Sequence, residues 1–204
     1  MTRSSTTLSA QGTQLLISRL SKAARSLCRF LDDLLLNPEK SEVVAVGTPA
    51  QIRFATKDFK INVAGSSLHL VDNVKSLGVY TDSNLSMDVQ VSAVCRSCNF
   101  HIRAFRPIRP DLLADLAKIF SCRIVGSRLD YCNSLLYGIS AKNLKTLQRV
   151  QNNLPRITLM TPRRSSAEPL LRSLHWLPVV QHIKYKIAML TDSSANDRTA
   201  TVFF

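Results

Sequence analysis

The order of apolar and polar positions divides the chain into an amphipathic helix, a short β-rich segment and a longer helical part. From residue 14 to residue 36, apolar side chains recur every three or four positions, which predicts one helix that Asn37-Pro38 ends. Between residues 40 and 81, short apolar runs alternate with Gly, Pro and Ser turn signals, which predicts hairpins. The expected strands cover residues 43–46, 52–54, 59–63, 68–70 and 74–80.

A helical period dominates after Asp82-Ser83-Asn84, which is typical of a helix start. Pro107 and Pro110 are expected to end the first helix, and Asp111 is expected to cap the second. The expected helices cover residues 85–105, 111–124, 142–153, 168–174 and 179–190, followed by an irregular tail at 191–204. The predicted fold class is therefore α+β and mostly α, with a small antiparallel β segment followed by a helical bundle.

Residues 127–138 carry one further apolar stripe within the helical part. Leu129, Cys132, Leu135 and Leu136 share one face of a 3.6-residue period, and Gly138 follows at a natural helix stop. This stretch is expected to form a helix of its own or to continue the preceding one.

The charge is uneven along the chain. There are 27 Lys and Arg residues against 14 Asp and Glu, a net charge of +13, and the segment from residue 95 to 190 holds 16 basic residues against four acidic ones. Such an excess favours a polyanionic partner, RNA or DNA bound through its phosphates, whereas a solvated helix surface is the alternative. The candidate phosphate-binding side chains are Arg103, Arg106, Arg109, Arg123, Lys142, Lys145, Arg149, Arg163 and Arg164.

The five cysteines are odd in number and irregularly spaced, which argues against a secreted disulfide framework. Cys95 and Cys98 match C-x-x-C, but a zinc site needs a second ligand pair, so two small side chains on a helix are expected and no metal. No apolar run is long enough for a membrane span, and the polar N-terminus lacks a signal peptide core. We expect an intracellular protein of the nucleus or cytoplasm.

Several ordered motifs between about residues 13 and 190 resemble one protein family. These are Ser127–Gly138 (SRLDYCNSLLYG), Leu147–Asn153 (LQRVQNN), Leu174–Pro178 (LHWLP) with Ile183–Lys186 (IKYK), Leu36–Glu42 (LNPEKSE), and Leu77–Val79 (LGV) with Asp82 and Leu85. Together they resemble the end of the palm and the thumb of reverse transcriptases from non-LTR, LINE-type retrotransposons of the jockey-like and chicken-repeat-like groups. The resemblance implies an RNA-directed DNA polymerase fold with a primer-grip hairpin and a helical thumb.

The same resemblance shows that the catalytic residues are missing. The family holds Mg²⁺ on an Asp-Asp turn and one earlier aspartate, and these metals activate the primer hydroxyl. In this sequence Gln11 and Gly12 align with the two aspartates, and neither is an anionic ligand. Lys40 matches a turn lysine of the family thought to assist pyrophosphate departure, and an exposed turn lysine is an equal alternative. No catalytic residue and no cofactor are therefore expected.

A second Asp-Asp pair, in Phe30-Leu31-Asp32-Asp33, also fits the short polymerase motif. It lies inside a helical period, where two adjacent carboxylates would point about 100° apart rather than together on a hairpin tip. We therefore interpret Asp32 and Asp33 as part of a solvated helix face. His175 and Trp176 are compatible with stacking on a base, but a buried corner is favoured for them.

The resemblance divides the chain into a palm remnant (1–83), a thumb-like helical domain (84–190) and the tail (191–204). The expected function is that of a truncated, degenerate reverse transcriptase fragment that does not polymerise DNA and binds nucleic acid without sequence specificity. The alternative is a structural or protein–protein interaction module that self-associates through apolar faces left exposed. A third possibility is part of an intact polymerase whose catalytic half lies upstream.

Overall fold

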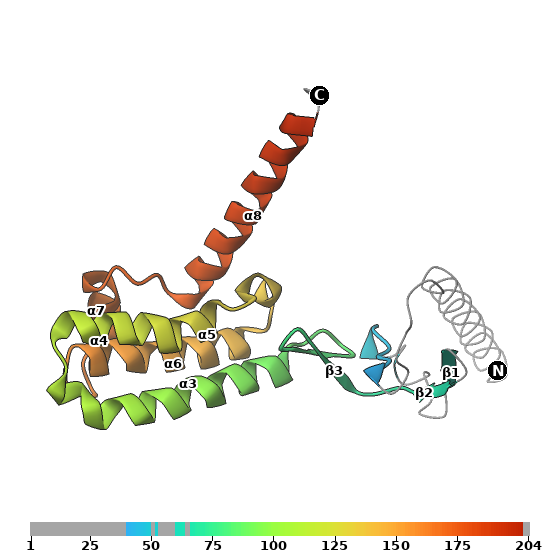
Figure 1. Ribbon diagram of the computed structural model, residues 1–204. Coiled ribbons are helices and arrows are strands. Elements are labelled where there is room, and N and C mark those ends of the chain that lie inside the picture. The colour runs from blue at the N-terminus through green and yellow to red at the C-terminus, as the bar shows by residue number, and fades with distance from the viewer. Residues whose placement is uncertain (1–39, 50–51, 53–59, 64–65, 202–204) are drawn as a thin grey trace, which may run out of the picture. The chain divides into compact units, whose positions relative to one another are not determined.

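The computed structural model describes residues 40–49, 52, 60–63 and 66–201, and the chain divides into two compact units between Ser86 and Met87 (Figure 1). The boundary expected from the sequence lay three residues earlier, after residue 83. The predicted helix at 14–36, the two aligned residues Gln11 and Gly12, and the Asp32-Asp33 pair lie outside the described residues.

The described part of the first unit consists of two antiparallel hairpins. Strand β1 (Lys60–Val63) pairs with β2 (Ser66–His69), and β3 (Asn73–Ser76) pairs with β4 (Val79–Asp82). The second hairpin turns at Leu77 and Gly78, whose positive φ angles of 48° and 83° match the two-residue turn that suits the twist of the strands. The continuous strand expected at 74–80 is therefore wrong, because this turn interrupts it.

The strand expected at 43–46 is also absent as a strand. Val43 makes only an isolated parallel bridge to Leu70, in which the Val71 amide donates to the Val43 carbonyl at 2.8 Å. A single bridge fixes one residue pair and does not build the ladder that a strand needs. The β-rich character of residues 60–82 is confirmed.

The second unit is helical from Asp88 onward, and Figure 1 shows α3, α4, α5 and α6 lying alongside one another. Its elements are α3 (Asp88–Ile108), η2 (Arg109–Asp111), α4 (Ala114–Phe120), the π-helical η3 (Ser121–Gly126), α5 (Ser127–Asp130), η4 (Asn133–Leu136), α6 (Ala141–Thr158), α7 (Ala167–Ser173) and α8 (Val179–Thr201). The fold class α+β, mostly α, is confirmed.

Helices α3 and α6 run parallel to each other, and polar contacts join both their starts and their ends. At the starts, the Asn143 amide donates to the Asp88 carboxylate at 2.6 Å, and at the ends, Arg109 Nε donates to the Thr158 carbonyl at 2.7 Å. The segment α4–η3–α5 runs back in the opposite direction and packs against both helices, and Ser121 Oγ lies 2.7 Å from Thr158 Oγ1. These contacts fix the register of the bundle.

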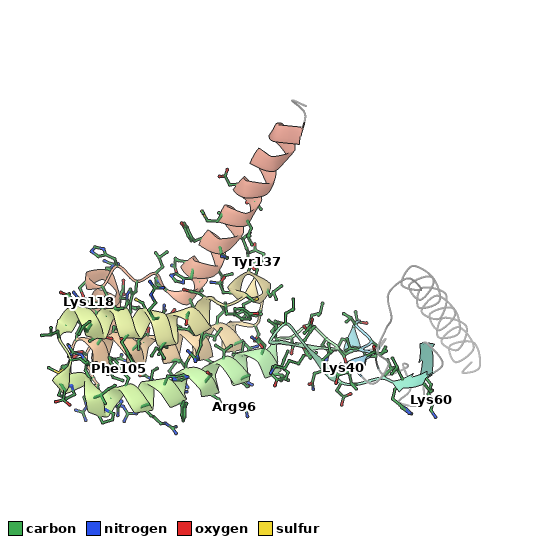
Figure 2. The ribbon with its side chains drawn as sticks, viewed as in Figure 1. Lys40, Lys60, Arg96, Phe105, Lys118 and Tyr137 are labelled. Atoms are coloured by element: carbon green, nitrogen blue, oxygen red, sulfur yellow. The ribbon has the colours of Figure 1, made fainter. Side chains whose placement is uncertain are left out.

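The hydrophobic core lies between these helices. The buried positions of α3 are spaced alternately by four and three residues, which places one narrow stripe against α6. Phe105 is fully buried near the end of α3, and its ring stacks on that of Phe120 at 4.8 Å (Figure 2). On α6, Leu147, Val150 and Leu154 are buried, as their spacing predicted.

The helix expected across residues 127–138 is wrong. Helix α5 ends at Asp130, Cys132 adopts a left-handed φ of 52°, and a 3₁₀ turn follows. Of the proposed stripe, Leu136 is buried, whereas the Leu135 side chain is 56% exposed. The short 3₁₀ turn rotates side chains by about 120° per residue, so these neighbours no longer share a face.

The other corrections concern the residues at which helices begin and end. Pro107 and Pro155 lie inside the last turns of α3 and α6, which continue to Ile108 and Thr158. The start expected at residues 82–85 is displaced to Asp88, because Leu85 and Met87 adopt left-handed φ angles of 54° and 60° that no α-helix contains. The expected Asp111 cap is replaced by α4 beginning at Ala114. The tail expected to be irregular from residue 191 is helical to Thr201 as part of α8.

Among the helices of the described residues, none combines the length and apolar character that crossing a bilayer requires.

Candidate nucleic-acid interface

Four arginines line a groove of about 410 Å³ where the ends of α3 and α6 meet. Arg106 and Arg109 come from the end of α3 and from η2, Arg156 from the last turns of α6, and Arg163 from the loop after α6. Asn153 and Thr161 add neutral polar groups to the lining, and no acidic residue lines this groove. We call it the arginine groove.

Arg109 is a structural member of the arginine groove. Arg109 is only 7% exposed. Its Nε donates to the Thr158 carbonyl at 2.7 Å, and its Nη1 donates to the Leu112 carbonyl at 2.9 Å. The side chain therefore satisfies carbonyls that helix ends leave without an intrahelical partner. Because Arg109 is also buried, we interpret it as a structural residue rather than the phosphate-binding residue expected from the sequence.

Arg156 is held in place without losing its charge. Its Nε donates to the Ser165 carbonyl at 2.9 Å, and its Nη1 donates to the Asn152 carbonyl at 3.0 Å and lies 3.4 Å from Asn153 Oδ1. All these partners are neutral. The guanidinium is thus oriented before any ligand arrives, which reduces the entropy lost on binding an anion.

The positive charge of the arginine groove is not neutralised by neighbouring carboxylates. In the described part of the chain the ion pairs join Lys118 to Asp115, Arg172 to Glu168 and His182 to Asp130. None of them includes a groove arginine. An anion entering the groove would therefore meet guanidinium groups that have no competing ionic partner.

A stripe of basic side chains leads along α6 to this groove. Lys142, Lys145 and Arg149 are exposed, and together with Arg156 they fall within an arc of about 60° on the helix, given 100° per residue. Asn153 and Ile157 lie on one side of this arc and line the arginine groove. We call these four residues the basic stripe.

The structure thus separates the nine candidates of the sequence into groups. Arg106, Arg109 and Arg163 line the arginine groove, and Lys142, Lys145 and Arg149 lie on the basic stripe. The remaining candidates are exposed and line neither feature: Arg103, Arg123 and Arg164. Sequence reasoning missed Arg156, although its spacing of seven residues from Arg149 and fourteen from Lys142 was a readable signal.

Cys95, Cys98 and Lys40, which the sequence also singled out, belong neither to the arginine groove nor to the basic stripe. Cys95 and Cys98 are buried in α3, and burial raises the pKa of the Cys98 thiol to about 12. Within the described ranges, no three His, Cys, Asp or Glu side chains are grouped so that they could hold a metal ion. Lys40 is exposed in the first unit.

His175 and Trp176 form the corner between α7 and α8. His175 is exposed, whereas Trp176 is partly buried and lines a small cavity together with Cys122. Both residues were expected to be buried in a corner. Trp176 is buried only in part and His175 is not buried, and both side chains line a second groove beside α6.

Comparison with known proteins gave no match: no protein-family model, no curated protein and no solved structure is similar to this chain at a significant level. The geometry of the arginine groove and of the basic stripe, together with the motifs of the sequence, is therefore the basis for inferring a function.

Proposed function

We propose that this chain is a degenerate relative of LINE-type reverse transcriptases, whose thumb-like helical unit binds RNA or DNA through phosphates. The observation that carries the binding proposal is the arginine groove, where four arginines gather and no carboxylate lies among the lining residues. The motifs of the sequence, which include the α6 segment LQRVQNN, support the family assignment.

The geometry favours phosphates over carboxylates as ligands. A phosphate group presents several oxygens to several donors at once, and guanidinium forks match them with paired hydrogen bonds. The basic stripe extends the positive charge beyond the groove, so a repeated polyanion makes more contacts than a single small anion does. Phosphates carry no direct sequence information, so binding through these groups is expected to be independent of sequence.

The proposal includes the absence of polymerase activity. Two-metal catalysis needs carboxylates that bridge the metals, and Gln11 offers a neutral amide while Gly12 offers no side chain. The donor set at the aligned positions therefore does not fit Mg²⁺, and no catalytic step is derived. The proposed location is an intracellular compartment that contains nucleic acid, the nucleus or the cytoplasm.

Two assays test the proposal with the purified chain. A gel-shift titration at low salt is expected to retard short RNA and DNA strands with similar affinity, and no shift would reject the binding role. Primer extension on an RNA template with Mg²⁺ is expected to give no product, and a Mg²⁺-dependent product would reject the claim of inactivity.

A protein-interaction module remains the second candidate because one apolar face is exposed. Leu113, Leu116 and Ile119, at spacings of three residues in and before α4, are 75%, 51% and 56% exposed. Such a face favours association with another apolar surface, including a second copy of the chain. Sedimentation of the purified protein tests this candidate: a concentration-dependent dimer that Leu116→Glu abolishes supports it, and a monomer at all concentrations rejects self-association.

A further inference from the structure

A second groove, of about 760 Å³, lies on the other side of the basic stripe from the arginine groove. Gln148 and Asn152 of α6 line it, and in helical projection they fall on the edge of the stripe opposite to Asn153 and Ile157. The corner at His175 and the first turn of α8 complete it. We call it the corner groove.

The charge of the corner groove is balanced, unlike that of the arginine groove. The charged residues that line it, Glu168 and Arg172, form an ion pair with each other at 2.7 Å between Oε1 and Nη2. The groove therefore has no excess charge to attract a phosphate. Its chemistry suits a neutral ligand with polar edges.

Side-chain amide groups line the corner groove. Some are hydrogen-bonded within the protein, and others have no partner among the described residues. Gln148 Nε2 donates to Asn152 Oδ1 at 2.7 Å, and Gln148 Oε1 accepts from the Val179 amide at 2.9 Å. These bonds orient Asn152 while its own amide nitrogen makes no hydrogen bond to any described residue, and the amide of Gln181 likewise has no partner there. Donors and an acceptor are thus available for the edge of a planar polar ring.

Aromatic rings provide the stacking surface. Trp176 is held by the bond from its backbone amide to the Leu171 carbonyl at 2.8 Å, and its side chain is partly buried beside Cys122. His175 lies beside it and is exposed. A rigid indole with free amides nearby is the combination that proteins use to bind unpaired bases, because stacking is sequence-tolerant and the amides hydrogen-bond base edges.

We infer that the corner groove binds an unpaired nucleobase of a single strand whose phosphates lie on the basic stripe. This inference rests on the proposed function and makes it more specific: single strands are the preferred ligand, because bases in a duplex are paired and stacked out of reach. The basic stripe lies between the two grooves on α6, so one strand contacts the stripe with its backbone and the corner groove with a base.

The fluorescence of Trp176 tests the inference, because it is the only tryptophan of the chain. The probes are an oligothymidylate of about 12 nucleotides, an abasic deoxyribose-phosphate strand of the same length, and polyglutamate. We expect the oligothymidylate to quench the fluorescence and the abasic strand to bind in a gel shift without quenching it. Polyglutamate is expected to leave the fluorescence unchanged.

Each other outcome has a distinct meaning. Binding of both strands with equal quenching, or with none, overturns the base site while the phosphate role stands. Quenching by polyglutamate also overturns it, because the groove would then respond to any polyanion. Quenching by oligothymidylate without any binding of the abasic strand supports the base site and rejects the phosphate role. If neither strand binds, both proposals are rejected.

Variants measured by anisotropy of a dye-labelled strand provide a second readout that does not need the tryptophan. Trp176→Phe keeps a stacking ring and is expected to retain affinity for oligothymidylate, whereas Trp176→Leu is expected to lose about tenfold. Asn152→Ala with Gln181→Ala is expected to weaken oligothymidylate and leave the abasic strand unchanged. Thr146→Ala, on the same helix, is the matched control, since its hydroxyl donates to the Lys142 carbonyl and it lines neither groove. Equal losses for both strands would overturn the inference.

Discussion

The end of α6 and the start of α8 use charge in opposite ways. At α8, His182 Nδ1 lies 2.5 Å from Asp130 Oδ1, so a positive charge on the imidazole would be balanced within the bundle. At the end of α6, Arg156 and its neighbours line a groove that contains no carboxylate. Paired charges of this kind connect structural elements, whereas a cluster of like charges has to be stabilised by something else. The difference points to an anionic ligand at the arginine groove and to none at the α8 contact.

Within the arginine groove itself, Arg109 and Arg163 differ in the same sense. Arg109 is buried and donates to two carbonyls, while Arg163 is exposed and no hydrogen bond holds its guanidinium among the described residues. Arg109 is thus a structural residue, and Arg163 is the proposed ligand-binding residue. Substitutions at these positions should separate the two roles through their effects on stability and on binding.

Arg109→Leu is expected to lower the free energy of unfolding by about 2–3 kcal/mol, because the buried Thr158 carbonyl and the partly buried Leu112 carbonyl lose a charged donor. Urea denaturation followed by circular dichroism measures the change. Arg163→Gln in the same groove is the control, and its stability should stay within about 0.5 kcal/mol of the native chain. Equal stability of Arg109→Leu and the native chain would contradict the structural role.

Replacing Arg156 and Arg163 together by Gln is expected to weaken binding of short RNA or DNA strands about tenfold at low salt, because two phosphate contacts are lost. Anisotropy titration of a labelled strand measures it. Arg96→Gln removes the same kind of charge from an exposed position of α3 outside the groove (Figure 2) and serves as the control. If Arg96→Gln weakened binding as much per charge removed, the groove would have no special role.

The His182–Asp130 contact predicts a modest pH dependence of stability. The hydrogen bond to Asp130 raises the pKa of His182 in the folded state, although partial burial opposes this. The contact therefore stabilises fully below the unfolded pKa of about 6.5, and the effect is lost as the pH rises through the raised folded pKa.

The expected size of this effect is below about 1 kcal/mol, since both side chains are about a third or more exposed and solvent screens them. Urea denaturation at about pH 5 and about pH 8 should show a smaller drop with rising pH in Asp130→Asn than in the native chain. The same pH profile in both proteins would show that the pair contributes nothing.

The smallest effect is expected at the exposed pair of Glu168 and Arg172, whose side chains are 72% and 80% exposed. Glu168→Gln should leave the stability of the chain unchanged within experimental error, because solvent-exposed ion pairs contribute little. Thermal denaturation in parallel with the native chain measures it. A clear loss of stability would show that this pair also has a structural role, as the α8 contact does.

The sequence predicted most helices of the bundle and the hairpins of residues 60–82, because hydrophobic period and turn chemistry are local signals. It did not predict that Arg109 is buried and Arg156 partly exposed, because their spacing on the chain says nothing of which helix end they meet. The parallel packing of α3 and α6 decides this, and it depends on contacts such as Asn143 with Asp88, 55 residues apart.

Residues 127–138 show the same limit of local signals, in this case for secondary structure. Its apolar spacing fits a helix, yet Cys132 takes a left-handed conformation and a 3₁₀ turn replaces the second half. Burial of Leu136 against the bundle decides the local conformation there, and helical period alone does not. The corner groove was visible in the sequence only in part: His175 and Trp176 were singled out as compatible with base stacking, but Asn152 and Gln181 join them only through the packing of α6, α7 and α8.

The salt dependence of binding tests the central claim most directly. Three groove arginines, Arg106, Arg156 and Arg163, and three further stripe residues, Lys142, Lys145 and Arg149, are available for phosphates. If all of these contacts form, the logarithm of the affinity for a single strand should fall against the logarithm of the salt concentration with a slope of about −4 to −5. A slope near zero, or no binding at low salt, would contradict the account.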